Sequence, residues 1–176
     1  MTALPRPNPD EHDPYYAGYI AEASRHGNDV LALLETQVPL IAAAGRIPAP
    51  TAEHAYAAGK WTVKEVLGHL ADAERIFAYR ALRFARADAT ELPGFDENTY
   101  VPAGNFGRRT VPDIATELAA VRAASLALFR SLDATSGARR GNANGSPCSA
   151  RAIPWIVAGH FAHHVGVLRD RYGIRL

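Results

Sequence analysis

The 176-residue sequence has a single cysteine, Cys148, and no apolar run that approaches the ~20 residues of a membrane-spanning helix. One cysteine can form neither an internal disulfide nor a thiolate-rich metal site. The opening stretch, MTALPRPNPDEHDPYY, does not have the basic and then apolar pattern of a signal peptide. We therefore expect a cytoplasmic protein that does not cross a membrane.

The sequence also has almost no charge imbalance. Its formal net charge is +1, and no basic or acidic block stands out, which argues against nucleic acid and anionic membranes as partners. Hydrophobic residues make up 48% of the chain, so a folded globule is expected. The length fits a single domain, and we expect its partner to be a small-molecule substrate.

Alternating strand patterns are nearly absent, whereas apolar residues recur at helical spacing. We predict an irregular arm over residues 1–12, followed by one four-helix-bundle domain over residues 13–176. The segment 137–147, GARRGNANGSP, is interpreted as a loop from its composition. The predicted helices are a short one from Asp13, a first bundle helix capped by Asn28 and ending near 44, a second from Thr62 to about 86, a third from 110 to 133, and a fourth from about 149 to 172.

Two histidines fall in the middle of the apolar face of the fourth helix. On a wheel of about 100° per residue with Ile153 at zero, His160 lies near 340° and His164 near 20°, whereas His163 lies on the flank near 280°. Buried imidazoles need partners, and side chains four residues apart can converge on one metal ion. The alternative is a pair of core histidines that hydrogen-bond to their neighbours.

Two further polar residues stand out on the second helix. His69 lies at the edge of the apolar face, where it could serve as a third ligand or simply border solvent. Glu74 lies within the apolar face, where an unpaired carboxylate would be costly. It could accept a hydrogen bond from a ligand imidazole, but we favour a structural pair with an arginine such as Arg171.

Three stretches resemble the DinB/YfiT-like superfamily, and in particular its YfiT branch. They are KWTVKEVLGHLADAERIFAYRALRFAR at 60–86, LPGFDENTYV at 92–101, and GHFAHHVGVLRDRY at 159–172. The resemblance implies an all-α four-helix bundle in up-down-down-up order, with a long crossover at 89–109 between the second and third helices. It also implies a metal site and, for many members, a homodimer. Carried over to this sequence, the ligands are His69, His160 and His164.

The implied site suggests an enzyme. Three histidines leave a position open on a divalent ion, with zinc the first expectation and nickel or iron as alternatives. Such an ion could activate a low-molecular-weight thiol of the bacillithiol or mycothiol type for transfer to an electrophile, or a hydroxide for hydrolysis. A third possibility is a non-catalytic, metal-binding stress-response bundle.

The crossover supplies the remaining candidates for the substrate pocket. Its residues Asp96, Glu97, Asn98 and Tyr100 could reach the metal site, although helical periodicity cannot place them. Hydrolysis would call for a general base, and the only inward carboxylate that can be placed on a helix is Glu74. This balance favours thiol transfer.

Overall fold

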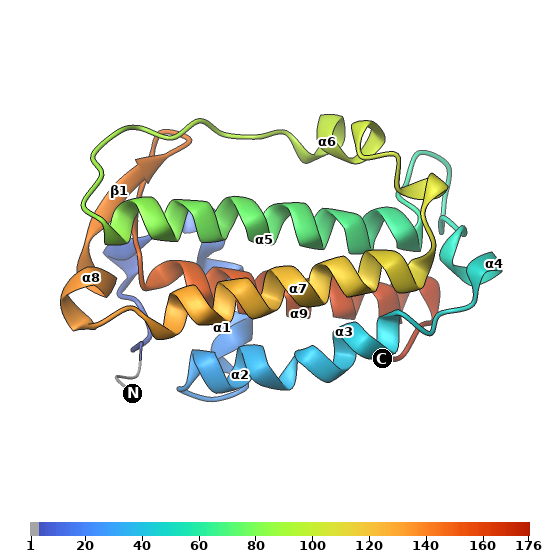
Figure 1. Cartoon of the computed structure of the whole chain (residues 1–176), viewed down its shortest axis with the longest axis horizontal. Coiled ribbons are helices and arrows are strands. Elements are labelled where there is room, and N and C mark those ends of the chain that lie inside the picture. Colours follow the sequence, from blue (N-terminus) through green and yellow to red (C-terminus); the bar gives the residue numbers. More distant parts are fainter. Residues whose placement is uncertain (1–3) are drawn as a thin grey trace.

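A computed structural model describes residues 4–176 and contains four long helical segments packed side by side (Figure 1). The bounds of the elements are α1 (Ala17–Ser24), α2 (Val30–Thr36), α3 (Val38–Ala44), α4 (Ala49–Ala52), α5 (Val63–Ala85), α6 (Glu97–Ala103), α7 (Val111–Arg130), α8 (Ala134–Ala138), α9 (Ala152–Tyr172), β1 (Arg140–Ala143) and β2 (Ser146–Ser149), with 3-10 turns at Pro9–Glu11, Pro14–Tyr16 and Phe106–Arg108.

The four bundle segments are α2 followed by α3, then α5, α7 and α9. In Figure 1, α5 and α7 run in the same direction, and the α2–α3 pair and α9 run the opposite way. The connection between α5 and α7 returns along the outside of the bundle, as a crossover between parallel helices must. The predicted all-α bundle with up-down-down-up order is therefore confirmed. Within residues 4–176, no helix combines the length and apolar character that a membrane crossing requires.

Local sequence signals set several helix ends. Thr62 and Glu65 form a capping box at the start of α5: Thr62 Oγ1 accepts from Glu65 N at 3.2 Å, and Thr62 N donates to Glu65 Oε2 at 2.6 Å. Gly173 ends α9 in the left-handed conformation, with φ 69°. At α2 the cap is Asp29, whose Oδ1 accepts from two backbone amides, and not the predicted Asn28.

The prediction of a loop over residues 137–147 is wrong. It contains most of an antiparallel β-hairpin, β1–β2, whose turn residues Asn144 and Gly145 have φ values of 57° and 74°. Asn-Gly with positive φ at both positions is the preferred two-residue hairpin turn. Because Ser149 belongs to β2, α9 begins at Ala152, a few residues later than predicted.

The crossover is more ordered than a bare connection, because it holds α6 and pairs with the hairpin. Leu92 N donates to Asn142 O at 3.0 Å, and Asn144 N donates to Leu92 O at 2.9 Å. Two connections that are distant in the sequence are thereby tied together. Together they lie along α5 on the outer side of the bundle (Figure 1).

Residues 4–12 of the predicted arm pack against the bundle, and residues 1–3 lie outside the described chain. The side chain of Leu4 is 3% exposed, and its carbonyl accepts from Trp155 Nε1 at 3.3 Å. The buried Glu11 forms an ion pair with Arg151 near the start of α9. The arm therefore covers one end of the core.

A polar layer divides the bundle core into two apolar clusters. One cluster contains Phe77, Phe129 and Ile156, and the other contains Leu67 and Leu118. Between them every bundle segment contributes a buried polar side chain. These side chains are Gln37 between α2 and α3, His69 and Glu74 on α5, Arg122 on α7, and His160 on α9.

Candidate metal centre

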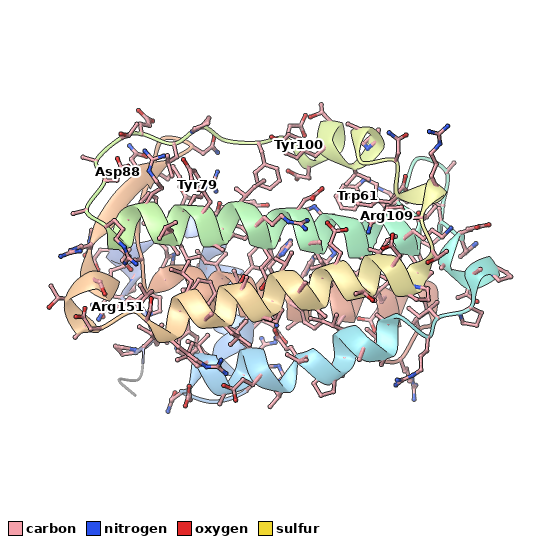
Figure 2. The ribbon with its side chains drawn as sticks, in the orientation of Figure 1. Trp61, Tyr79, Asp88, Tyr100, Arg109 and Arg151 are labelled. Carbon is pink, nitrogen blue, oxygen red and sulfur yellow. The ribbon has the colours of Figure 1, made fainter. Side chains whose placement is uncertain are left out.

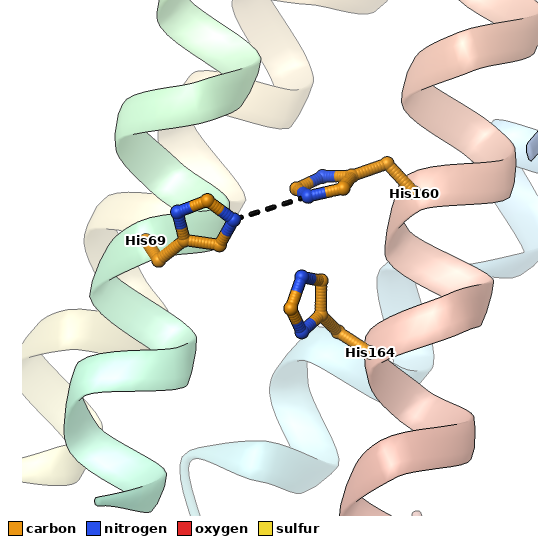
Figure 3. A group of neighbouring side chains, drawn as sticks. All are labelled: His69, His160 and His164. Atoms are coloured by element: carbon orange, nitrogen blue, oxygen red, sulfur yellow. Dashed lines mark hydrogen bonds between the residues drawn. The ribbon is translucent and has the colours of Figure 1, made fainter. Parts of the chain in front are cut away.

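Three histidines converge in the polar layer at the α5–α9 interface. His69 projects from α5, and His160 and His164 project from α9 one turn apart, with their rings directed toward one another (Figure 3). The Nε2 atoms of His69 and His160 are 3.1 Å apart, and each of the three rings offers a nitrogen within 4.8 Å of the others. His163, which the helical wheel places on the flank, is exposed and not a member of this group.

Glycines allow neighbouring elements to approach close beside two of these histidines. A Cβ on Gly159 would lie 1.8 Å from the carbonyl oxygen of Tyr19, so α1 can pack on α9 only because Gly159 has no side chain. This approach brings the Tyr19 ring to 5.4 Å from the ring of His160. Gly68 likewise leaves room for the ring of Phe106 against α5. The histidines therefore project from backbones that are held tightly in place.

Burial keeps all three imidazoles neutral. It lowers the pKa of His69 to about 4, an effect that the negative charge of Glu97 partly offsets. Burial, reinforced by His69 and His163, lowers the pKa of His164 to about 3. The pKa of His160 falls well below its usual value, again chiefly through burial and then through the neighbouring histidines. A neutral imidazole is the form that binds metal ions.

The arrangement fits a divalent ion. Ligand nitrogens 2.0–2.1 Å from a tetrahedral ion are separated by about 3.3 Å, which lies within the spread of the three nitrogens. His164 Nδ1 is buried and has no hydrogen-bond partner among residues 4–176. In Figure 3 this nitrogen points away from His69 and His160, and the other ring nitrogen of His164 faces them. Among residues 4–176 the three rings share one hydrogen bond, between His69 and His160, so a shared ion explains their convergence better than core histidines satisfied by their neighbours.

The histidines form one wall of a pocket of about 450 Å³, a volume typical of small-molecule sites. Six tyrosine, tryptophan and phenylalanine side chains contribute to the rest of its lining, among them Trp61, which precedes α5 (Figure 2). The lining comes from the N-terminal turn and α1 (Asp13, Tyr15, Tyr16, Tyr19), from α5 and the segment just before it (Trp61, His69, Ala73, Phe77, Arg80), from the crossover (Gly94, Phe95, Glu97), from the hairpin (Ala143, Asn144, Ser146), and from α9 (His160, His163, His164).

Comparison with known proteins agrees with this fold. The model of the DinB superfamily matches residues 10–168, which is most of the chain. The chain belongs to the DinB superfamily. No protein of curated function is significantly similar to it.

A solved structure has the same architecture as this DinB-superfamily chain. It is YfiT from Bacillus subtilis, described as "a probable metal-dependent hydrolase with an unusual four-helix bundle topology". The two chains share 18% sequence identity and superpose with a TM-score of 0.67 over 95% of this chain and 93% of YfiT. At this identity the likeness establishes the fold, and it confirms the bundle topology read from the sequence.

The crossover places one of its four candidate residues in the pocket. Glu97 lines the pocket, is half-buried, and acts electrostatically on His69. Asp96 instead caps α6 through a 2.9 Å bond from Asn98 N, and Asn98 is exposed. Tyr100 is 47% exposed on α6 (Figure 2), where its ring packs on Phe95. Glu97 is therefore the carboxylate that sequence periodicity could not place.

The prediction that Glu74 forms a structural pair with an arginine is confirmed, but Arg171 is the wrong partner. Glu74 pairs with Arg122 of α7, whose Nε and Nη2 donate to its two oxygens at 2.8 and 2.9 Å. Arg171 is exposed near the end of α9. The prediction failed because it placed the residues on single helices without the register between helices: Glu74 and Arg122 are each the twelfth residue of their parallel helices, so they lie level.

The sequence analysis missed the other buried charge of the pocket, Arg80. It lies 11 positions after His69, about 20° away around the helix at 100° per residue, so the two share one face of α5. That spacing could have identified it. Cys148, by contrast, is buried, and burial raises the pKa of its thiol to about 12, so it is not a nucleophile near neutral pH.

Proposed function

We propose that this protein is a metal-dependent enzyme in which His69, His160 and His164 hold a divalent ion at the wall of the pocket. The observation that carries the proposal is the convergence of three neutral imidazoles, each offering a nitrogen within 4.8 Å of the others, on a pocket of about 450 Å³. A divalent ion with three protein ligands keeps an open position and lowers the pKa of a thiol or water bound there. We propose zinc first, with nickel and iron as alternatives.

Within this proposal, the reaction we favour is transfer of a low-molecular-weight thiol, of the bacillithiol or mycothiol type, to a small electrophile. The thiol gives up its proton to solvent, and its sulfur forms a carbon–sulfur bond while a leaving group such as chloride departs from the same carbon. The aromatic lining, with Trp61, Phe77 and Phe95, suits an apolar or aromatic electrophile. This chemistry needs no side chain as general base.

Thiol transfer can be tested with 1-chloro-2,4-dinitrobenzene as the electrophile. The zinc-loaded protein is assayed with bacillithiol, with mycothiol and without either, and the His160→Ala variant is the control. The proposal expects conjugation that depends on the thiol and is lost in the variant. Absence of conjugation with both thiols would overturn thiol transfer.

Hydrolysis is the second candidate, and the position of Glu97 favours it. A carboxylate that lines the pocket and acts on His69 is suitably placed to accept a proton from an attacking water. The description of YfiT as a probable metal-dependent hydrolase points the same way.

The Glu97→Gln variant separates the two reactions. If the enzyme is a hydrolase, cleavage of an activated ester such as p-nitrophenyl acetate should fall by about 10²- to 10⁴-fold in this variant while its metal content stays unchanged. Under thiol transfer, conjugation should stay within a few-fold of wild type. If neither reaction occurs and the protein keeps its stability after chelation, the third reading, a non-catalytic metal-binding bundle, replaces both.

A homodimer and a cytoplasmic location complete the proposal and rest on the family resemblance and the sequence composition.

A further inference from the structure

Arg80 occupies the end of the pocket away from the histidines. It follows His69 by three turns on the same face of α5, a rise of about 16 Å between their backbones. Its side chain is 6% exposed and lines the pocket together with segments of the crossover and the hairpin. The pocket is therefore elongated along α5, with nitrogen ligands at one end and a guanidinium at the other.

Arg80 differs from the other buried cations of the described chain. Lys64 pairs with Glu53 at 3.0 Å, and Arg122 forks onto Glu74. Arg80 forms no ion pair with any carboxylate in residues 4–176, and its polar contacts there are a hydrogen bond from Nη2 to Pro93 O at 3.0 Å and a contact with the hydroxyl of Tyr16. A guanidinium has five N–H donors, so most of its capacity is unused. A buried charge without a counterion is costly, and such groups are normally paired.

The pocket's own carboxylates do not neutralise Arg80. Asp13 accepts from Tyr15 N at 2.7 Å and from Ser146 Oγ, and these two contacts lower its pKa. Glu97 exerts its charge on His69 at the other end. The immediate neighbours of the guanidinium are the hydroxyl of Tyr16, whose pKa is raised by burial and which is therefore neutral, and the rings of Phe77 and Phe95, whose centroids each lie 6.0 Å from Cζ.

We propose that Arg80 binds the carboxylate of a small-molecule reactant whose other end reaches the three-histidine centre. A planar guanidinium fork matches a carboxylate in shape and charge. Neither a lysine nor a second arginine is found among the described residues that line this pocket, so one positive charge faces the ligand. A single charge between two aromatic rings suits a carboxylate better than a phosphate dianion. This inference rests on the proposed function in taking the pocket as the active site.

The test uses two thiols that differ only at the far end, 6-mercaptohexanoate and 6-mercaptohexanol. Their affinities for the Co²⁺-loaded protein are measured by calorimetry. Because a hydrogen bond to a charged group contributes about 1.5–3 kcal/mol, the acid should bind about 10- to 100-fold more tightly than the alcohol. The Arg80→Met variant should lose this preference, and Arg80→Lys should keep part of it. Arg75→Met removes an exposed arginine from the same helix and should behave like wild type.

Several results would overturn the inference. They are equal affinities for the two thiols in the wild type, a preference that survives in Arg80→Met, and tighter binding of the matching phosphonate than of the acid. If Arg80→Met fails to fold, the wild-type comparison and Arg80→Lys still decide the question. The sulfur-to-cobalt absorption band is a separate readout. If neither thiol produces this band, the thiol does not bind the metal. The difference in affinity between the acid and the alcohol, measured by calorimetry, still tests whether Arg80 binds the carboxylate.

Discussion

Arg122 donates from Nε and Nη2 to the two carboxylate oxygens of Glu74, at 2.8 and 2.9 Å, in the middle of the bundle. Its Nη1 also donates to Leu34 O and to Gln37 Oε1, and Gln37 Nε2 donates to Ala158 O. One guanidinium thus connects all four bundle segments. The network lies in the same polar layer as the histidines and holds α5 and α9 at a fixed separation.

Breaking this pair should destabilise the fold strongly. Glu74→Gln or Arg122→Met leaves an unpaired charge in the core, so we expect the free energy of unfolding to fall by about 3–5 kcal/mol in urea denaturation. Arg75→Met, which breaks the exposed pair with Glu117, should cost no more than about 1 kcal/mol. Similar losses for buried and exposed pairs would show that the network does not stabilise the bundle.

Metal affinity should depend on three histidines and not on a fourth. We expect His69→Ala, His160→Ala and His164→Ala each to weaken zinc binding by more than about 100-fold, beyond the 10- to 100-fold effect typical of a residue that only orients a ligand. His163→Ala should stay within a few-fold of wild type. Competition with a chelating dye measures the affinities, and circular dichroism checks the fold. If His163 proves essential, the assignment of ligands is wrong.

The metal-free protein should lose stability as the pH falls from about 6.5 toward 4. The pKa of His69 is about 4 in the folded chain against 6.5 for an ordinary histidine, so the unfolded chain binds more protons in this range. Above pH 6.5 the imidazole of His69 is neutral in both states and does not affect stability, and by pH 4 the preferential protonation of the unfolded chain lowers the free energy of unfolding by on the order of 3 kcal/mol. Urea titrations of wild type and His69→Gln should show a shallower pH slope in the variant. Equal slopes would contradict the prediction.

Packing of α1 should depend on Gly159. A Cβ there would collide with the carbonyl of Tyr19, so Gly159→Ala should push α1 away, cost about 1–3 kcal/mol and disturb the pocket wall. Gly166→Ala, on the same helix, meets nothing within 4 Å and should stabilise α9 by roughly 0.5–1 kcal/mol. Thermal denaturation of the two variants measures the contrast. A neutral Gly159→Ala would mean that α1 packs more loosely than described.

The sequence predicted those features that depend on a single helix. The Thr62–Glu65 box located the start of α5, and the helical wheel placed His160 and His164 on the buried face with His163 beside it. Features that depend on two elements were missed. The partner of Glu74 required the register between α5 and α7, and the β-hairpin was hidden by short strands of polar and small residues around Asn144 and Gly145.

Arg80 shows a second limit of prediction from the sequence. Its periodic position beside His69 was readable, but the lack of a counterion became visible only when the crossover and the hairpin were in place. Likewise, Glu97 could be named as a candidate from the sequence but could be assigned to the pocket only from the path of the crossover.

The pocket is assembled from two kinds of structure. The histidines stand on long helices fixed by the polar layer, whereas much of the opposite wall comes from the crossover and the hairpin, which are joined through Leu92. Insertions and exchanges are tolerated far better in surface connections than in packed helices. The same scaffold can therefore acquire a preference for a new reactant by remodelling these two joined connections while the ion-holding helices stay as they are, so that selectivity can evolve independently of the underlying chemistry.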